Sequence, residues 1–288
     1  MNEIGSIKKV REMLQENQFR IKKHYGQNFI TDQNLLKKIV DSANIGPECG
    51  VIEVGPGFGA LTQHLVGKAK KVLAFEIDKE LIPLLQSQFI NYPAFILIHQ
   101  DILEVQIDEV IHTYLSDCKE IVVVANLPYY ITTPILMRFL ETSQKVSRLI
   151  LMMQHEVAMR ITGKPNTKDY NALSIVIQYL AKAKLLFKVP RTVFIPAPNV
   201  DSAIVHLEIK KTKELNPQLE PRFFDFVHQC FTQRRKTLMN NLKASNLGKS
   251  KEEYETSLTS LGIALDARSE QLDVVTFLAL FHQLGENV

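Results

Sequence analysis

The chain has 288 residues, of which 45% are hydrophobic and 23% charged, and its formal net charge is +3. The length suffices for one large domain or for one ordinary domain plus a smaller one, and the proportions are ordinary for a soluble globular protein. No apolar run approaches the ~20 residues that cross a bilayer, and the charged N-terminus lacks an apolar signal-peptide core, so a cytoplasmic protein with no membrane attachment is expected.

Cysteines and histidines give no sign of a metal site. Cys49, Cys118 and Cys230 lie far apart in the chain and match neither a zinc-like nor a paired spacing. The eight histidines form no clustered ligand set. Reduced thiols and no bound metal are therefore expected.

The chain begins with a polar lead-in and an amide-rich loop. Residues 1–23 are predicted to be helical and end in the basic residues Lys22 and Lys23. The loop that follows contains glycine and side-chain amides, and Thr31 or Asp32 can cap the amphipathic helix after it.

From residue 51 onward, strands alternate with helices. Five strands are predicted, at 51–54, 71–75, 94–98, 122–126 and 148–153. The helices between them include one over 60–67, one capped by Asp78 and one from Thr133. This alternation predicts an α/β fold with a parallel sheet and right-handed crossovers.

The second half of the chain changes character. Two further strands are predicted at 185–189 and 203–209. A linker rich in lysine, asparagine and proline at 210–221 then marks the best domain boundary. Only helices are predicted after it, one of them opened by Arg234, Arg235 and Lys236.

A glycine-rich loop follows the first strand of the alternating region. Gly55, Gly57 and Gly59 allow the main chain to turn sharply and to approach a ligand at a helix N-terminus. The loop also fits the dinucleotide fingerprint, which leaves a nicotinamide cofactor as an alternative. The GxGxG spacing, with Glu53 two residues before the first glycine, favours S-adenosylmethionine.

Polar residues end the next three strands. Glu76 can accept hydrogen bonds from both hydroxyls of a ribose, and Asp101 can accept one from an adenine amino group. The fourth strand stops at Asn126 and Pro128, because proline cannot donate to a ladder. Ligands of open α/β sheets bind outside the carboxyl ends of the strands. Hydrogen-bond acceptors beside the ring of Tyr129 suit a flat, polar substrate such as a nucleobase.

Five segments carry a family resemblance. They are Gly26-Gln27-Asn28-Phe29, Gly55-Pro-Gly57-Phe-Gly59, Asn126-Leu-Pro-Tyr129, Pro196-Ala-Pro-Asn-Val-Asp-Ser202 and Phe231-Thr-Gln-Arg-Arg-Lys-Thr-Leu238. On these segments the chain resembles the small-subunit (16S) ribosomal RNA adenine N6,N6-dimethyltransferases, the KsgA/RsmA family. The resemblance runs from about Lys22 to the last helix. The glycine pattern is common to a whole superfamily, whereas the other segments occur in a narrower group of proteins.

The resemblance implies a fold and a domain plan. The fold is a Rossmann-like S-adenosylmethionine-dependent methyltransferase sheet of seven strands, the last antiparallel, with a small all-helical C-terminal domain. The plan has a polar, basic lead-in over 1–23, a catalytic domain over 24–210 and a helical RNA- or ribosome-binding domain over 211–288.

The resemblance also implies an activity. It is the transfer of two methyl groups to N6 of each of two adjacent adenosines in a loop near the 3′ end of 16S rRNA. The expected cofactor is S-adenosyl-L-methionine, and the expected partner is 16S rRNA within the immature 30S subunit, bound by a monomer. The residues implied in cofactor binding are Asn28, Ile30, Gly55, Gly57, Glu76, Asp101 and Asn126.

A catalytic hypothesis follows from the chemistry of adenine, whose N6 lone pair is delocalised into the ring. Asn126 Oδ1 and the carbonyl of Leu127 or Pro128 are expected to accept hydrogen bonds from the amino group and turn that lone pair toward the methyl donor. Tyr129 is expected to stack on one face of the base, and Phe194 on the other. Tyr130 is assigned to packing.

Two basic patches are expected to bind RNA phosphates. The residues assigned to them are Arg222, Arg234, Arg235, Lys236, Lys22 and Lys23. Three alternatives to the dimethyltransferase remain: a large-subunit rRNA adenine methyltransferase of the antibiotic-resistance type, a mainly non-catalytic ribosome-assembly factor and a nicotinamide-dependent oxidoreductase.

Overall fold

A computed structural model describes residues 4–16, 19, 21–22 and 25–285. The chain forms two compact units. Unit 1 holds the residues up to Ala158 together with Lys184–Ile209, and unit 2 holds Met159–Ala183 together with the residues from Lys210 onward. One junction therefore falls at the linker that the sequence indicates. The segment 159–183 belongs with the helical unit, whereas the sequence-based plan placed it in the catalytic domain.

Unit 1 is built around a mixed seven-stranded sheet with the strand order β4-β3-β2-β5-β6-β9-β7. The strands are β2 (Cys49–Val54), β3 (Lys71–Glu76), β4 (Phe95–His99), β5 (Glu120–Asn126), β6 (Val146–Gln154), β7 (Ala181–Val189) and β9 (Ser202–Ile209). The strands β2 to β6 pair in parallel, and β9 pairs with β6 in antiparallel fashion. The predicted Rossmann-like sheet with an antiparallel last strand is confirmed.

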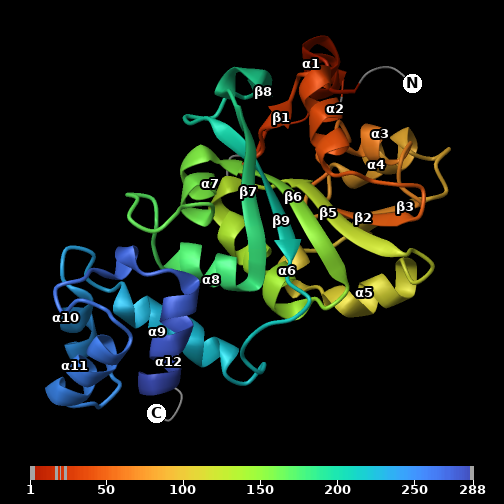
Figure 1. Cartoon of the computed structure of the whole chain (residues 1–288). Helices are drawn as coiled ribbons and strands as arrows, with labels where there is room; N and C mark the ends of the chain where they lie inside the picture. Colours follow the sequence, from red (N-terminus) through yellow and green to blue (C-terminus); the bar gives the residue numbers. More distant parts are fainter. Residues whose placement is uncertain (1–3, 17–18, 20, 23–24, 286–288) are drawn as a thin grey trace. The chain divides into compact units, whose positions relative to one another are not determined.

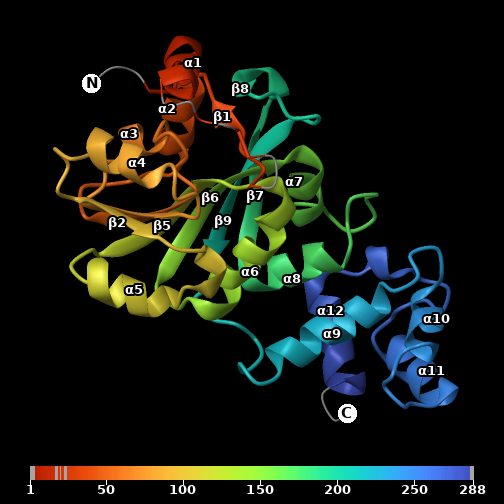
Figure 2. The same ribbon diagram turned by 180° about the vertical axis from the view of Figure 1, so that it is seen from behind.

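Helices cover both faces of this sheet, as Figures 1 and 2 show. One face carries α2 (Gln33–Ser42), α3 (Thr62–Leu65) and α4 (Ile82–Gln88), and the other carries α5 (Ile107–Tyr114) and α6 (Thr132–Thr142). On the first face, buried residues of α2 and α3 pack against the valines of β2 and β5. A sheet covered on both sides explains why its strands read as continuous apolar runs.

The N-terminal segment up to residue 30, called the lead-in from here on, contains α1 (Ile7–Glu16) and the short strand β1 (Phe29–Ile30), which pairs antiparallel with β8 (Phe194–Ile195). Asp32 caps α2 by accepting a hydrogen bond from the N–H of Leu35 at 3.0 Å. Rings from the lead-in and the glycine loop pack together, since Phe29 stacks on Phe58 with 4.2 Å between centroids. The lead-in is thereby held against the glycine loop.

Two helix predictions in unit 1 are wrong in detail. The helix expected over 60–67 is helical only at α3, because Gly59 has φ of +80° and the chain continues in turns to Leu61. Asp78 does not cap α4, whose N-cap is Leu81. The Asp78 carboxylate instead accepts hydrogen bonds from Lys22 and Gln27 of the lead-in.

Unit 2 is helical apart from the first residues of β7. Its helices are α8 (Ala172–Leu180), α9 (Glu220–Cys230), α10 (Leu238–Lys243), α11 (Lys251–Ser260) and α12 (Val274–Leu284), and α7 (His155–Ile161) spans a unit boundary. Phe223 and Phe226 of α9 pack on Phe281 of α12 to form its core. No helix among the described residues is long and apolar enough to cross a membrane.

The prediction that the basic run Arg234–Lys236 opens a helix of unit 2 is wrong. Arg234, Arg235 and Lys236 lie in turns, and α10 begins only after Thr237. The Thr237 side chain caps α10 by accepting a hydrogen bond from the N–H of Asn240. A threonine cap of this kind sets the helix start, so the three preceding cations stay outside it.

Candidate active site

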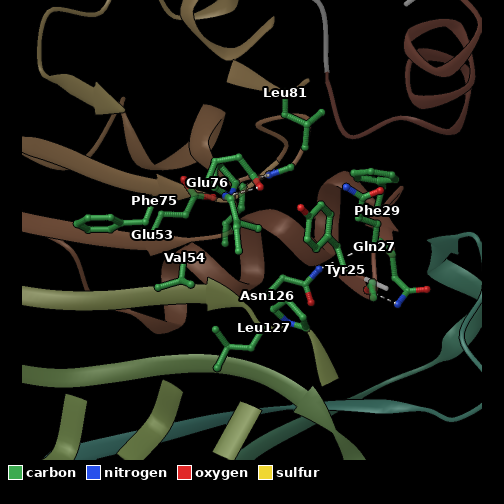
Figure 3. A pocket seen from close by; sticks show the side chains of 18 of the residues that line it. Tyr25, Gln27, Phe29, Glu53, Val54, Phe75, Glu76, Leu81, Asn126 and Leu127 are labelled. Atoms are coloured by element: carbon green, nitrogen blue, oxygen red, sulfur yellow. Dashed lines mark hydrogen bonds between the residues drawn. The ribbon is translucent and has the colours of Figure 1, made fainter. Parts of the chain in front are cut away.

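The carboxyl ends of β2, β3, β4 and β5 open onto one cavity of unit 1 (Figure 3). With its open mouth, the cavity holds about 1280 Å³ of empty space. The predicted site residues in its wall are Asn28, Ile30, Gly55, Gly57, Glu76, Asp101, Asn126, Leu127, Pro128 and Tyr129.

The glycine loop exposes its main chain to this cavity. Gly55 has φ of +68° and Gly57 of +59°, a region that side chains disfavour. A Cβ added to Gly55 would meet no atom within 4 Å, so the space beside this residue is open. At Gly57, a Cβ would press on the ring of Phe29 at 3.2 Å. The loop therefore exposes its backbone to a ligand at Gly55, and at Gly57 it allows the Phe29 ring of the lead-in to pack closely against it.

Glu76 ends β3 as a nearly buried carboxylate, 5% exposed. Its Oε1 accepts hydrogen bonds at 2.9 Å from the N–H groups of Ile77 and Asp78, and its Oε2 accepts one at 3.2 Å from Gly57. Burial raises the pKa of Glu76, and these backbone hydrogen bonds partly offset the rise. The bonds fix both oxygens at the cavity wall, where Oε2, which has one donor, keeps acceptor capacity for a hydroxyl group.

Glu53 of β2 also lines the cavity but is 1% exposed. Burial raises its pKa to about 8, although a hydrogen bond of 2.7 Å from the Thr62 hydroxyl opposes the rise. The negative charge of Glu76 raises it further. Glu53 is therefore mainly protonated at neutral pH and adds no second charge beside Glu76.

Asp101 and Asn28 are held by local hydrogen bonds. Asp101 Oδ1 accepts from the N–H of Leu103 at 2.9 Å, which caps a short 3₁₀ helix over Ile102–Glu104. The second oxygen of Asp101 stays available to a ligand. The side chain of Asn28 donates to the carbonyl of Gly26 at 2.9 Å.

The orientation of the Asn126 amide follows from its partner. Asn126 Nδ2 donates to the backbone carbonyl of Asn28 at 3.2 Å. A carbonyl oxygen only accepts, so the NH₂ group must face Asn28, and Oδ1 is left for another donor. Figure 3 shows Asn126 between the Glu76 side of the cavity and the lead-in loop.

The two backbone carbonyls after Asn126 differ. Pro128 O accepts hydrogen bonds from the Thr132 hydroxyl at 3.0 Å and from the N–H of Ile131 at 3.3 Å, so it is committed to the start of α6. Within the described part of the chain, no donor binds the carbonyl of Leu127. Of the two carbonyls that the sequence suggested as acceptors, that of Leu127 is therefore the one available to a substrate amine.

The two tyrosines after Pro128 have different surroundings. Tyr129 is half-buried, and its hydroxyl pairs with the Ser202 hydroxyl at 2.6 Å. Tyr130 lines the cavity but is 57% exposed, with its ring close to Gly26, where a Cβ would lie 3.3 Å from it. The assignment of Tyr130 to packing is therefore wrong.

Comparison with known proteins agrees with this geometry. A family model described as ribosomal RNA adenine dimethylase matches residues 18–285. The chain is also 46% identical over 285 residues to the "Ribosomal RNA small subunit methyltransferase A" of Geobacillus sp. (strain WCH70), covering 98% of each protein. This chain belongs to the ribosomal RNA adenine dimethylase family.

Solved structures extend the likeness. The crystal structure of a dimethyladenosine transferase from Plasmodium falciparum matches with a TM-score of 0.73 and 26% identity, over 88% of this chain and 96% of that one. The crystal structure of the 23S rRNA methyltransferase ErmE matches with a TM-score of 0.69 and 26% identity, over 89% of this chain and 99% of that one. The same fold thus occurs in a dimethyladenosine transferase and in a 23S rRNA methyltransferase.

One residue singled out by the family motifs lies away from the cavity. Phe194 is 3% exposed and packs in the core with Ile30 and Ile204, on the strand β8 that pairs with β1. It is not part of the cavity wall. Burial in the core, which its apolar ring favours, removes it from the position expected for stacking on a base.

The basic residues expected to bind RNA divide into two groups. Lys22 pairs with Asp78 at 2.5 Å and with Glu80 at 3.1 Å, and Arg222 donates to the carbonyl of Gly285 at 2.8 Å. Both cations are engaged inside their own units. Lys23 lies outside the described residues.

Arg234, Arg235 and Lys236 are exposed on unit 2. Arg234 donates to the carbonyl of Lys168 and shares a surface hollow with Lys168 and Arg268. Lys168 and Arg268 were not predicted to bind RNA, because neither lies in a basic cluster of the sequence. No group of three or more potential metal ligands is found among the described residues.

Proposed function

We propose that this chain uses S-adenosyl-L-methionine to dimethylate N6 of two adjacent adenosines in a loop near the 3′ end of 16S rRNA, within the immature 30S subunit. The observation that carries the proposal is the orientation of Asn126, whose Oδ1 is kept for a donor while Nδ2 is held by Asn28. Full-length similarity to a small-subunit methyltransferase supports the same reaction class.

The residues of the cavity fit the cofactor. The open main chain at Gly55, the fixed carboxylate of Glu76 and the second oxygen of Asp101 suit an amino acid tail, a ribose and an adenine, respectively. Asn28, Ile30 and Gly57 would complete the cradle. When bound, S-adenosylmethionine supplies a methyl group on a sulfonium, a leaving group that needs no acid to depart.

The chain's contribution is to direct the nucleophile. Asn126 Oδ1 and the Leu127 carbonyl each accept an N–H of the adenine amino group, which turns the nitrogen lone pair away from the ring system. Alignment of this kind supplies most of the rate when the leaving group is already activated. The methylated nitrogen then loses one proton to water. The amine keeps one N–H, so one of these acceptors still orients it for the second transfer.

The target base also needs a surface to stack on. Tyr129 has its ring fixed by the hydrogen bond to Ser202, and Tyr130 presents an exposed ring at the same cavity. Stacking contributes ~1–3 kcal/mol per base, which offsets removal of an adenosine from its neighbours. The buried position of Phe194 does not support a stacking role for it.

RNA binding is assigned to Arg234, Arg235 and Lys236, whose side chains are exposed. Such cations bind phosphates and give affinity without sequence selection. Lys22 and Arg222 have internal partners, so their contribution to RNA binding is small.

The deciding experiment supplies radiolabelled S-adenosylmethionine with small subunits that lack the modification and, separately, with large subunits. We expect label in the small-subunit rRNA only, as dimethyladenosine. The large-subunit alternative is disfavoured by 26% identity to the 23S enzyme against 46% to the small-subunit relative. Label in large subunits would support it, and label in neither would leave the assembly-factor alternative.

A further inference from the structure

Asp78 is a carboxylate that is 1% exposed and does not line the cavity. It accepts hydrogen bonds from Lys22 Nζ at 2.5 Å, from Gln27 Nε2 at 2.8 Å and from the N–H of Glu80 at 3.1 Å. Burial alone would raise the pKa of Asp78, but these three bonds outweigh it and lower the pKa. A buried charge is tolerated only when it is paired in this way.

Gln27 is fixed at both ends of its amide. Its Nε2 donates to Asp78, and its Oε1 accepts from the backbone N–H of Lys22 at 2.8 Å. The next residue is Asn28, whose carbonyl accepts the hydrogen bond from Asn126. The planar peptide between residues 27 and 28 ties the Cα of Asn28 to Gln27, and the Asn28 carbonyl lies two backbone torsions beyond it, so the position of Gln27 limits where that carbonyl can lie.

Asp78 is also tied to the cofactor side of the cavity. Its N–H donates to Glu76 Oε1 at 2.9 Å, and Glu76 lies only two residues earlier. A continuous path of hydrogen bonds and peptide groups therefore runs from Glu76 through Asp78, Gln27 and Asn28 to Asn126. It joins the ends of β3 and β5 across the lead-in.

We propose that Asp78 and Gln27 are positioning residues for methyl transfer, which hold the Asn28 carbonyl where it keeps Asn126 Oδ1 facing the substrate amine. This inference rests on the proposed function, because it assumes that Asn126 directs the amine. Lys22 supports the same tether through its ion pair with Asp78 rather than binding RNA.

The hydrogen bonds of Gln27 to Asp78 and to Lys22, called the tether, set the orientation of the Asn28 carbonyl and are not required for folding. The lead-in is also held by the stack of Phe29 on Phe58 and by the pairing of β1 with β8. Those contacts remain when the Gln27 bonds are lost, so the loop stays in place but the Asn28 carbonyl gains freedom. A misplacement of ~1 Å at a reacting group can cost ~100-fold in rate.

Swapping the two partners gives a sharp test. Gln27→Glu places two carboxylates against each other, since neither can donate. Adding Asp78→Asn restores a donor and an acceptor, with the hydrogen bond reversed and the net charge of the wild type. Gln27→Met removes both bonds at similar size, and Gln63→Glu makes the same charge change at a glutamine that accepts from Ile4 instead.

Single-turnover methyl transfer to unmodified small subunits is measured at saturating cofactor. The affinity for S-adenosylhomocysteine, the affinity for subunits and the melting temperature are measured alongside. For Gln27→Glu and Gln27→Met, the transfer rate should fall about tenfold or more, with subunit affinity changed by less than about threefold. The Gln27→Glu/Asp78→Asn pair should recover most of the loss, and Gln63→Glu should match the wild type.

A wild type that transfers no methyl group would overturn the proposed function itself, whereas the tether is judged by rates relative to an active wild type. Full transfer rates in both Gln27 variants would overturn the tether. So would a loss confined to the affinity for subunits. If Gln27→Glu does not fold, Gln27→Met decides alone through the same rate and affinity measurements.

Discussion

Asn126 and Asn28 are 98 residues apart in the chain, yet the side chain of one donates a hydrogen bond to the backbone carbonyl of the other at 3.2 Å. This contact decides which atom of the Asn126 amide can face a substrate. An amide that was free to rotate would present NH₂ as readily as oxygen, and NH₂ cannot accept a bond from an amine. The lead-in loop is thus part of the proposed active site.

Glu76→Gln should weaken cofactor binding by about 10- to 100-fold, since hydrogen bonds to a charged group contribute ~1.5–3 kcal/mol. A glutamine has one acceptor oxygen, whereas the Glu76 oxygens face three backbone N–H groups as well as the cavity. Calorimetric titration with S-adenosylhomocysteine measures the effect. Glu104→Gln, at an exposed residue, is the control and should bind as the wild type does. Equal affinity for both variants would contradict the role of Glu76.

Glu53→Gln should flatten the dependence of stability on pH. The pKa of Glu53 is about 8 in the folded chain and lies near 4.5 in the unfolded one. Between these values the unfolded chain binds fewer protons than the folded one. The free energy of unfolding therefore falls as pH rises, by up to ~1.4 kcal/mol per pH unit.

Urea unfolding at several pH values between about 5 and 8 measures that slope for wild type and variant. Glutamine keeps an acceptor for the Thr62 hydroxyl but does not titrate. The wild type should lose more stability than Glu53→Gln over this range. Parallel curves would show that Glu53 is ionised in the folded protein.

Tyr129→Ala should lower kcat/KM for small subunits by about 5- to 150-fold, the equivalent of ~1–3 kcal/mol of lost stacking. Tyr129→Phe keeps the ring and loses only the bond to Ser202, so its kcat/KM should stay much closer to the wild type. Cofactor affinity should be unchanged in both. A Phe variant as defective as the Ala variant would assign the effect to the hydroxyl instead.

Replacing Arg234, Arg235 and Lys236 with alanine should weaken subunit binding and reduce its salt dependence. Each lost phosphate contact lowers the slope of log affinity against log salt by about one. Arg222→Met is a suitable control in the same unit, because this guanidinium is bound to the carbonyl of Gly285. An unchanged slope in the triple variant would remove these residues from the RNA interface.

The sequence predicts those parts of the site that depend on strand ends. Gly55, Glu76, Asp101 and Asn126 each follow or end a strand with a clear apolar pattern, and parallel strands bring such ends to one edge. These four residues of the cavity wall were therefore predictable from order and spacing, whereas Asn28 and Ile30 were assigned to the site through the family resemblance.

Long-range partners were not predictable. The pairing of Lys22 with Asp78 spans 56 residues, and that of Arg222 with Gly285 spans 63. A local pattern shows that a side chain is charged but not which distant group neutralises it. The predictions for Phe194 and Tyr130 failed for the same reason, because the sequence around an aromatic ring gives no local sign of which neighbours will cover it.

The most direct test of the account is methyl transfer by Asn126→Ala to unmodified small subunits, measured beside subunit and cofactor binding. The variant loses the acceptor that directs the amine but keeps the Leu127 carbonyl, Tyr129 and the exposed cations of unit 2. We expect transfer to be abolished while the affinity for subunits stays within about threefold of the wild type. Retained transfer, or a loss of subunit binding in its place, would contradict the role of Asn126.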